Sequence, residues 1–156
     1  MLRTRYGVAL ALITLAGAVG GRSAATRAQQ GAPYTDQQAA AGQAAYAQSC
    51  GGCHGRTLSG AGEAPALAGS AFMGSWGSHT TRELFTRIRL SMPPENANGL
   101  SLDTYASIVA FLLKANGAQA GSSAFTPETN VPIASIANGQ MPAGLTAAGR
   151  DRKSVV

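Results

Sequence analysis

The most informative stretch of this chain is Cys50-Gly51-Gly52-Cys53-His54, which contains both of its cysteines. The spacing C-x-x-C-H is the attachment signature of a c-type haem. Two thiols at this separation can bond to the two vinyl groups of one porphyrin, and the adjoining imidazole then supplies a nitrogen to the iron. We therefore expect one covalent haem c, attached at Cys50 and Cys53, with His54 as an axial iron ligand.

Three other interpretations of the cysteine pair remain open at this stage. The pair could form a disulfide in an exported protein, or act as a thioredoxin-like redox pair. The redox pair needs a strand–helix–strand setting, whereas the flanking sequence is helical on one side and glycine-rich on the other. A structural zinc site needs four ligands, and only His54 and the distant His79 could complete it.

The first 28 residues have the pattern of a secretory signal peptide. Arg3 and Arg5 give a positive start, residues 6–21 are apolar or small apart from Thr14, and residues 26–28 are the last candidate cleavage site. The apolar stretch is short for a membrane span, although an uncleaved anchor is the rival interpretation. The sequence predicts a periplasmic protein without a stable membrane span after cleavage.

The distribution of charge argues against a nucleic-acid partner. The formal net charge is +5, but four of the twelve basic residues precede residue 29. Residues 34–117 contain five basic and five acidic residues. A near-neutral body lacks the broad positive surface that binds phosphate backbones.

The mature chain divides into two main parts by composition. Residues 34–117 hold both cysteines, both histidines and most of the aromatic residues. Residues 118–156 are rich in Gly, Ala, Ser and Pro, with isolated bulky residues at no fixed period. We expect the first part to be a single domain and the second to be an extended or weakly ordered tail.

The first expected helix of the domain runs from Thr35 to about Ser49. Thr35 and Gln38 have the spacing of a capping box at its start. Gly42 and Tyr46 lie four residues apart and therefore share a face. A glycine at this position would let another helix approach closely, while Tyr46 fills the space beside it.

Two more helices are expected further along the domain. One begins at Thr80, with Glu83 at the capping-box position. The other begins after Ser101 and carries apolar residues at helical spacing. Gly117 suits the left-handed position that follows a helix. No strand is indicated with comparable strength, so we expect an all-α fold.

Residues 34–117 resemble the class I cytochromes c, in particular small periplasmic monohaem cytochromes associated with quinoprotein dehydrogenases. The resemblance is carried, in the order typical of the family, by Cys50-Gly-Gly-Cys-His54-Gly55, Ala64-Pro65-Ala66-Leu67-Ala68-Gly69, Phe72 with Trp76, Leu84-Phe85 with Ile88, Met92-Pro93-Pro94, and the stretch from Tyr105 to Leu113. It implies a class I cytochrome c fold, with three main helices packed around a covalently attached haem and long loops between them. It covers a little over half of the chain and implies nothing about the tail.

Met92 is the expected sixth ligand of the iron. It follows the second expected helix, and Pro93 and Pro94 stiffen the loop in which its sulfur would be held. The Met-Pro-Pro context of the resembling family selects the same residue. Met73, only 19 residues after His54 in the sequence, and Met141, in the tail, are less suited. His79 is the other candidate, and its polar neighbours favour a surface role instead.

The resemblance implies two further residues of the haem site. In the family, the ligating histidine donates its other ring N–H to a backbone carbonyl, and the matching residue here is Pro65. By the same analogy, the indole N–H of Trp76 would reach a haem propionate. Without the resemblance, an ordinary loop proline and a packed core tryptophan would be the simpler interpretations.

The expected function is one-electron transfer rather than catalysis. With both axial positions of the iron filled, no substrate needs to reach the metal. By resemblance, the partners would be a quinoprotein dehydrogenase as donor and an oxidase or another cytochrome as acceptor. The alternative is a haem enzyme, or a sensor of gas or peroxide, in which the sixth ligand is labile.

Overall fold

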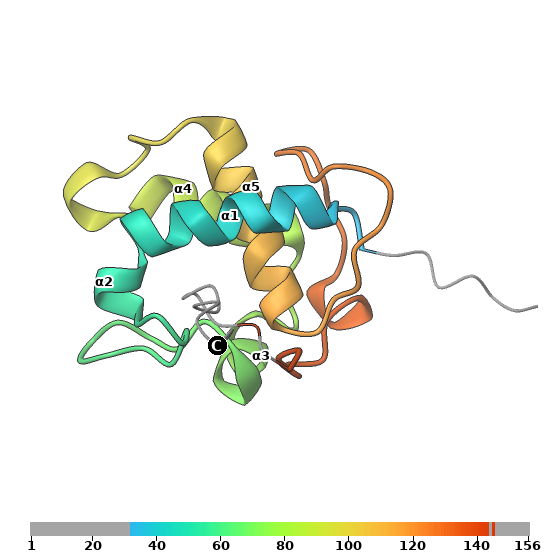
Figure 1. The fold of residues 1–156 in the computed structure, drawn as a ribbon, viewed down its shortest axis with the longest axis horizontal. Helices are drawn as coiled ribbons and strands as arrows, with labels where there is room; N and C mark the ends of the chain where they lie inside the picture. Colours follow the sequence, from blue (N-terminus) through green and yellow to red (C-terminus); the bar gives the residue numbers. More distant parts are fainter. Residues whose placement is uncertain (1–31, 144, 146–156) are drawn as a thin grey trace, which may run out of the picture.

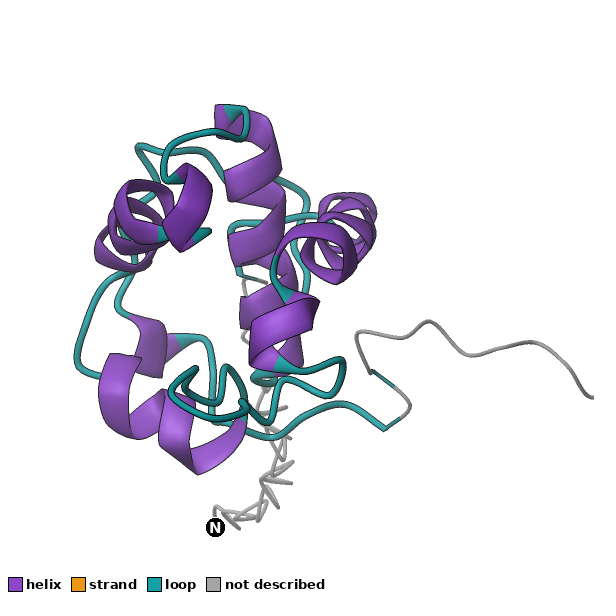
Figure 2. Cartoon of the chain, turned by 90° about the vertical axis from the view of Figure 1, so that its left-hand side faces the viewer, coloured by secondary structure: helices purple, strands orange, loops and turns teal. Residues whose placement is uncertain are grey.

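The computed structural model describes residues 32–143 and 145. Five α-helices and two short 3₁₀-helices are found there: α1 (Asp36–Ser49), α2 (Gly51–His54), α3 (Gly69–Trp76), α4 (Thr81–Ser91), η1 (Pro94–Asn96), α5 (Leu102–Ala115) and η2 (Ile133–Ser135). In this part of the chain, β-pairing is limited to three isolated bridges (Figure 2). The expectation of an all-α fold is confirmed. The predicted signal peptide, residues 1–28, lies outside the described residues.

The helices begin where the sequence predicts. Thr35 accepts a hydrogen bond from the Gln38 amide at 3.1 Å. At Thr80 both bonds of the capping box with Glu83 are present. Ser101 accepts from the Thr104 amide at 3.1 Å and caps α5. Each of these short side chains satisfies an amide that has no partner within its helix.

The Gln38 side chain does not make the hydrogen bond that the expected capping box requires. Instead of returning to Thr35, it exchanges two hydrogen bonds of 2.8 Å with the backbone N–H and C=O of Phe125. A primary amide donates and accepts at once, so it can satisfy both polar groups of an extended residue. This pairing, between residues 87 positions apart, replaces a local one.

The crossing of α1 and α5 is the central packing contact of the fold (Figure 1). At Gly42 the helices approach so closely that a Cβ atom would lie only 1.8 Å from the Ser107 carbonyl oxygen. Tyr46, one turn further along α1, is fully buried, and its ring centroid lies 5.4 Å from that of Phe111. The sequence prediction for Gly42 and Tyr46 is confirmed.

The short helices α2 and α3 are additions to the three helices that the sequence predicts. In α3, Phe72 is buried, while Met73 and Trp76 are partly buried against the core. The helix spans only eight residues and contains Gly74. So short a segment gives too little apolar periodicity to be recognised in the sequence.

Residues 118–143, which we call the C-terminal segment, pack against the domain (Figure 1, orange to red). Phe125 and Ile133 are buried, and the Phe125 ring centroid lies 6.2 Å from that of Phe85 in α4. This packing corrects the expectation of a weakly ordered tail for these residues. Phe125, Ile133 and the partly buried Ile136 join one hydrophobic cluster from an irregular segment, so their spacing follows neither a helix nor a strand period. Residues 144 and 146–156 of the predicted tail lie outside the described residues.

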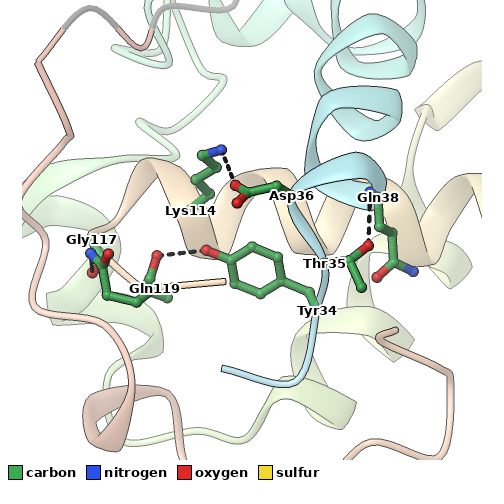
Figure 3. Close-up of polar contacts among 8 residues, drawn as sticks. Tyr34, Thr35, Asp36, Gln38, Lys114, Gly117 and Gln119 are labelled. Carbon is green, nitrogen blue, oxygen red and sulfur yellow. Dashed lines mark hydrogen bonds and ion pairs between the residues drawn. The ribbon is translucent and has the colours of Figure 1, made fainter. Parts of the chain in front are cut away.

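The C-terminal segment also closes onto the start of α1 (Figure 3). The buried Tyr34 hydroxyl donates to the carbonyl of Ala118 at 2.5 Å, and the Gly121 amide donates to the Tyr34 carbonyl at 2.8 Å. Nearby, Lys114 of α5 forms an ion pair with Asp36 of α1. The start of the described chain is therefore joined to the first residues of the C-terminal segment, next to the start of α1 and the end of α5.

Asn116, at the end of α5, joins three segments that are distant in sequence. Its buried side chain donates to the carbonyls of Leu67 and Leu112 at 3.0 and 2.9 Å, and accepts from the Gly69 amide at 3.0 Å. Its own carbonyl accepts from the amides of Asn138 and Gly139. One residue thus connects α5 with the segment before α3 and with the C-terminal segment.

The Gly42 contact gives a first prediction. Gly42→Ala should lower the free energy of unfolding by about 1–3 kcal/mol, because the added methyl group must force α1 and α5 apart. Gly74→Ala is the matched control, since its Cβ would meet nothing within 4 Å. That control should be neutral, or stabilising by up to about 1 kcal/mol from helix propensity. Urea unfolding followed by circular dichroism measures both, and equal effects would contradict the close approach.

A second prediction concerns Asn116. Asn116→Ala should lower the free energy of unfolding by about 2 kcal/mol or more, because partly buried polar groups of Leu67 and Gly69 lose their partner. The exposed Asn130 provides the control, and Asn130→Ala should stay within about 0.5 kcal/mol of the original chain. The same unfolding measurement applies. A loss as small as that of Asn130→Ala would show that the three bonds contribute nothing to stability.

Candidate haem-attachment site

The helical turn α2 presents the C-x-x-C-H motif directly after α1. The Cys50 amide donates to the Tyr46 carbonyl at 2.9 Å, and the amides of Cys53 and His54 both donate to the Cys50 carbonyl. Positions three apart in a helical turn lie on the same side, so the two thiols share one face. Gly55, at φ +79°, then turns the chain out of the helix in the left-handed region that glycine favours. The motif is therefore fixed by its connection to α1.

Both cysteines are free thiols in the structure, Cys50 half-buried and Cys53 exposed. Burial, and secondarily the neighbouring Cys53, raises the pKa of the Cys50 thiol to about 11. Reactive dithiol pairs have the opposite property, a lowered thiol pKa. The environment of Cys50 therefore does not favour the redox-pair interpretation.

The zinc interpretation finds no ligand set in the part of the chain that the structure describes. No group of three or more His, Cys, Asp or Glu side chains there is arranged to hold a metal ion. His79, the remaining candidate ligand, is half-exposed and lies 3.6 Å from a Glu83 carboxylate oxygen. Hydrogen bonds from the Thr80 backbone and side chain, with a smaller contribution from His79, lower the pKa of Glu83. His79 thus belongs to the polar surface at the start of α4.

His54 is buried, and its ring is oriented by Pro65. The His54 Nδ1 atom lies 2.9 Å from the Pro65 carbonyl oxygen. A carbonyl only accepts hydrogen bonds, so Nδ1 carries the proton in this contact, and the lone pair is left on Nε2. This is the contact that the family resemblance implies. It leaves Nε2 as the nitrogen that is able to bind a metal.

The segment between α2 and α3 holds the Pro65 carbonyl in place. The Gly60 amide donates to the His54 carbonyl at 2.9 Å, and the Leu67 amide donates to the Leu58 carbonyl at 2.8 Å. Gly60 has φ +74°, and a Cβ there would lie 2.5 Å from the Ala64 carbonyl oxygen. Because Asn116 also binds the Leu67 carbonyl, the segment is fastened on both sides of Pro65.

Met92 is held at the end of α4 by both of its backbone polar groups. Its amide donates to the Ile88 carbonyl at 2.8 Å, and its carbonyl accepts from the Tyr105 hydroxyl at 2.8 Å. The other methionines of the described chain are placed differently. Met73 packs against the core from α3, and Met141 is exposed. Met92 is partly buried in a firmly anchored backbone.

Trp76 lies at the end of α3, partly buried against the core. Its ring centroid is 5.4 Å from that of His79. In the described part of the chain, no hydrogen bond joins Trp76 or Met92 to the C-x-x-C-H motif. The structure therefore brings His54 and Pro65 into direct contact and places Trp76 and Met92 on separate elements.

The residues around the motif fit a flat, apolar cofactor. Several half-buried apolar side chains pack on the same hydrophobic cluster as Cys50, from the segment before α3, from α4 and from the loop before α5: Leu67, Ala68, Ile88 and Leu100. The chain alone leaves part of their apolar surface uncovered, which costs free energy in water. A porphyrin bonded at Cys50 and Cys53 would supply apolar area for such side chains to cover.

Two polar groups near the site escape recognition in the sequence. From the sequence, Tyr105 is recognised only as the start of a stretch that resembles the family, and its hydroxyl contact with Met92 is not anticipated. A buried tyrosine does need a partner for its hydroxyl, but the sequence does not tell which one. Asn116, which precedes Gly117, has the appearance of an ordinary helix end. Its three side-chain partners become visible only in the folded chain.

None of the helices in the described residues is long and apolar enough to cross a membrane. Searches of curated proteins and of solved structures found no match to this chain. A scan against protein-family models matched residues 37–112 to the family described as cytochrome C oxidase, cbb3-type, subunit III. The match spans the helices from α1 to α5 and includes the C-x-x-C-H motif and Met92. The chain therefore carries a class I cytochrome c domain, an electron-transfer module that works through a haem c and its iron.

Proposed function

We propose that this chain is a periplasmic monohaem cytochrome c that carries one electron at a time between partner proteins. The contact between His54 Nδ1 and the Pro65 carbonyl is the observation that carries the proposal. It fixes an imidazole with its Nε2 lone pair available, one residue after two free thiols of the right spacing. The bound haem c supplies an iron that cycles between the ferric and ferrous states.

Each proposed site residue has a distinct task. Cys50 and Cys53 would hold the porphyrin through thioether bonds, and His54 and Met92 would bind its iron. A methionine thioether is a weak, neutral ligand, and His/Met ligation raises the reduction potential. Pro65 makes His54 a more basic and better oriented ligand. The Trp76 indole N–H would donate a hydrogen bond to a haem propionate.

The anchored backbone of Met92 favours a carrier over an enzyme or sensor with a labile sixth ligand. An open iron site would require Met92 to leave the metal readily. Its amide and carbonyl are bound to α4 and α5 respectively, which opposes that movement. With His54 and Met92 both bound to the iron, the chain's own residues would keep a substrate away from it.

The proposed partners are redox proteins that meet this chain transiently. Weak electron-transfer encounters have small interfaces, which suits a small carrier. The sequence resemblance favours a quinoprotein dehydrogenase as the donor and an oxidase or another cytochrome as the acceptor. The matched family is named for a subunit of a cytochrome c oxidase, which agrees with an oxidase on the acceptor side. The periplasmic location rests on the signal pattern of residues 1–28.

The covalent attachment gives a third prediction. Produced in a host that matures c-type cytochromes, the purified protein should have the mass of its mature polypeptide plus one haem. Its pyridine haemochrome should have the form given by a porphyrin with two thioether bonds. The double variant Cys50→Ser/Cys53→Ser should carry no haem after denaturation, because both attachment atoms are removed. A colourless preparation with the bare polypeptide mass would refute the proposal.

The sixth ligand gives a fourth prediction. The ferric protein should show the weak far-red absorption band of methionine-ligated haem, and Met92→Ala should abolish it. Met73→Ala is the matched control and should keep the band, since Met73 packs against the core from α3. Rapid binding of carbon monoxide by the unaltered ferrous protein, together with absence of the band, would favour the enzyme or sensor instead.

A further inference from the structure

One tyrosine hydroxyl contacts both ends of the loop that contains Met92. This loop, residues 92–100, lies between α4 and Ser101, the residue that caps α5, and begins at Met92 itself. Tyr105 projects from α5, is 1% exposed, and donates its hydroxyl hydrogen to the Met92 carbonyl at 2.8 Å. The same oxygen accepts a longer hydrogen bond of 3.5 Å from the Leu100 amide. The hydroxyl therefore spans the loop from its first residue to its last.

The backbone of the loop leaves the Met92 carbonyl dependent on this donor. Pro93 and Pro94, which follow it, have no amide hydrogen. The amides further along donate elsewhere, that of Asn96 to the Pro93 carbonyl and that of Asn98 to the Arg89 carbonyl. Among the described residues, the Tyr105 hydroxyl is the hydrogen-bond donor to the Met92 carbonyl.

We propose that Tyr105 is a positioning residue, whose hydroxyl keeps the Met92 loop closed and so controls how readily the sixth iron ligand is displaced. The inference rests on the proposed function, because it takes Met92 as that ligand. Displacement of the sulfur becomes easier when the loop moves away from α5, because Met92 is the first residue of the loop. That movement breaks the hydrogen bond between the Tyr105 hydroxyl and the Met92 carbonyl. Both groups are then left without a partner or exposed to water, which costs free energy.

The chain provides a matched control for the loss of a buried tyrosine hydroxyl. Tyr34 is also fully buried and also donates to a backbone carbonyl, that of Ala118. Its bond joins the start of α1 to the C-terminal segment and touches no residue of the loop 92–100. Tyr34→Phe should therefore lower global stability without acting on Met92.

The test is a titration of the ferric, haem-loaded full chain with imidazole, which replaces a weak sixth ligand. Tyr105→Phe keeps the ring and removes only the hydroxyl. We expect it to bind imidazole about three- to tenfold more tightly than the original protein, the equivalent of one net hydrogen bond. Tyr34→Phe should bind imidazole as the original protein does. Equal affinities of the two variants would overturn the inference.

Two further measurements separate the possible failures. If the unaltered protein lacks the far-red band, or if Met92→Ala leaves imidazole binding unchanged, Met92 is not the ligand, and the proposed function fails with the inference. If Met92→Ala removes the band while Tyr105→Phe behaves like Tyr34→Phe, the inference fails alone. Proton NMR of the reduced, unaltered protein adds a test that needs no variant. The Tyr105 hydroxyl proton should exchange slowly with water and show Overhauser contacts to Met92. If no such slowly exchanging proton is detected, the hydrogen bond that the inference needs is not formed.

Discussion

The close approach of α1 and α5 at Gly42 is the constraint on which the rest of the structure depends. A single missing side chain lets the Ser107 carbonyl lie against the backbone of α1. The end of α1 then leads into the turn that carries Cys50, Cys53 and His54, while α5 carries Tyr105. The positions of both sides of the proposed iron site, the turn after α1 and the Met92 loop bound by Tyr105, therefore depend on one helix crossing. A shift at that crossing would move His54 and Met92 relative to each other.

Buried polar side chains that bind distant backbone groups supply much of the remaining order. Tyr34, Tyr46 and Tyr105 are all buried, and each donates its hydroxyl to a backbone carbonyl. Asn116 satisfies three backbone groups at once, and Gln38 satisfies two. In the described residues, no buried side-chain nitrogen or oxygen lacks a partner. These bonds fix irregular segments that have too few large apolar residues to be held by packing alone.

The features that the sequence predicts correctly are those determined within a few residues. The caps at Thr35, Thr80 and Ser101 depend on amides three positions away, and Gly42 is recognisable by its spacing from Tyr46. The features that it misses depend on partners far along the chain. Gln38 finds Phe125 across 87 positions, and Asn116 finds Leu67 across 49. The motif at residues 50–54 is local, whereas the contact between Tyr105 and Met92 requires the fold.

The C-terminal segment changes where this module ends. The family model stops at residue 112, yet Phe125 and Ile133 complete the core, and Ala118 pairs with Tyr34 at the opposite terminus of the folded chain. The residues before α1 and the C-terminal segment therefore hold each other in place. Moving this domain onto another protein would require the whole stretch from Ala32, whose amide donates to Gln119, to Gly139, whose amide donates to Asn116.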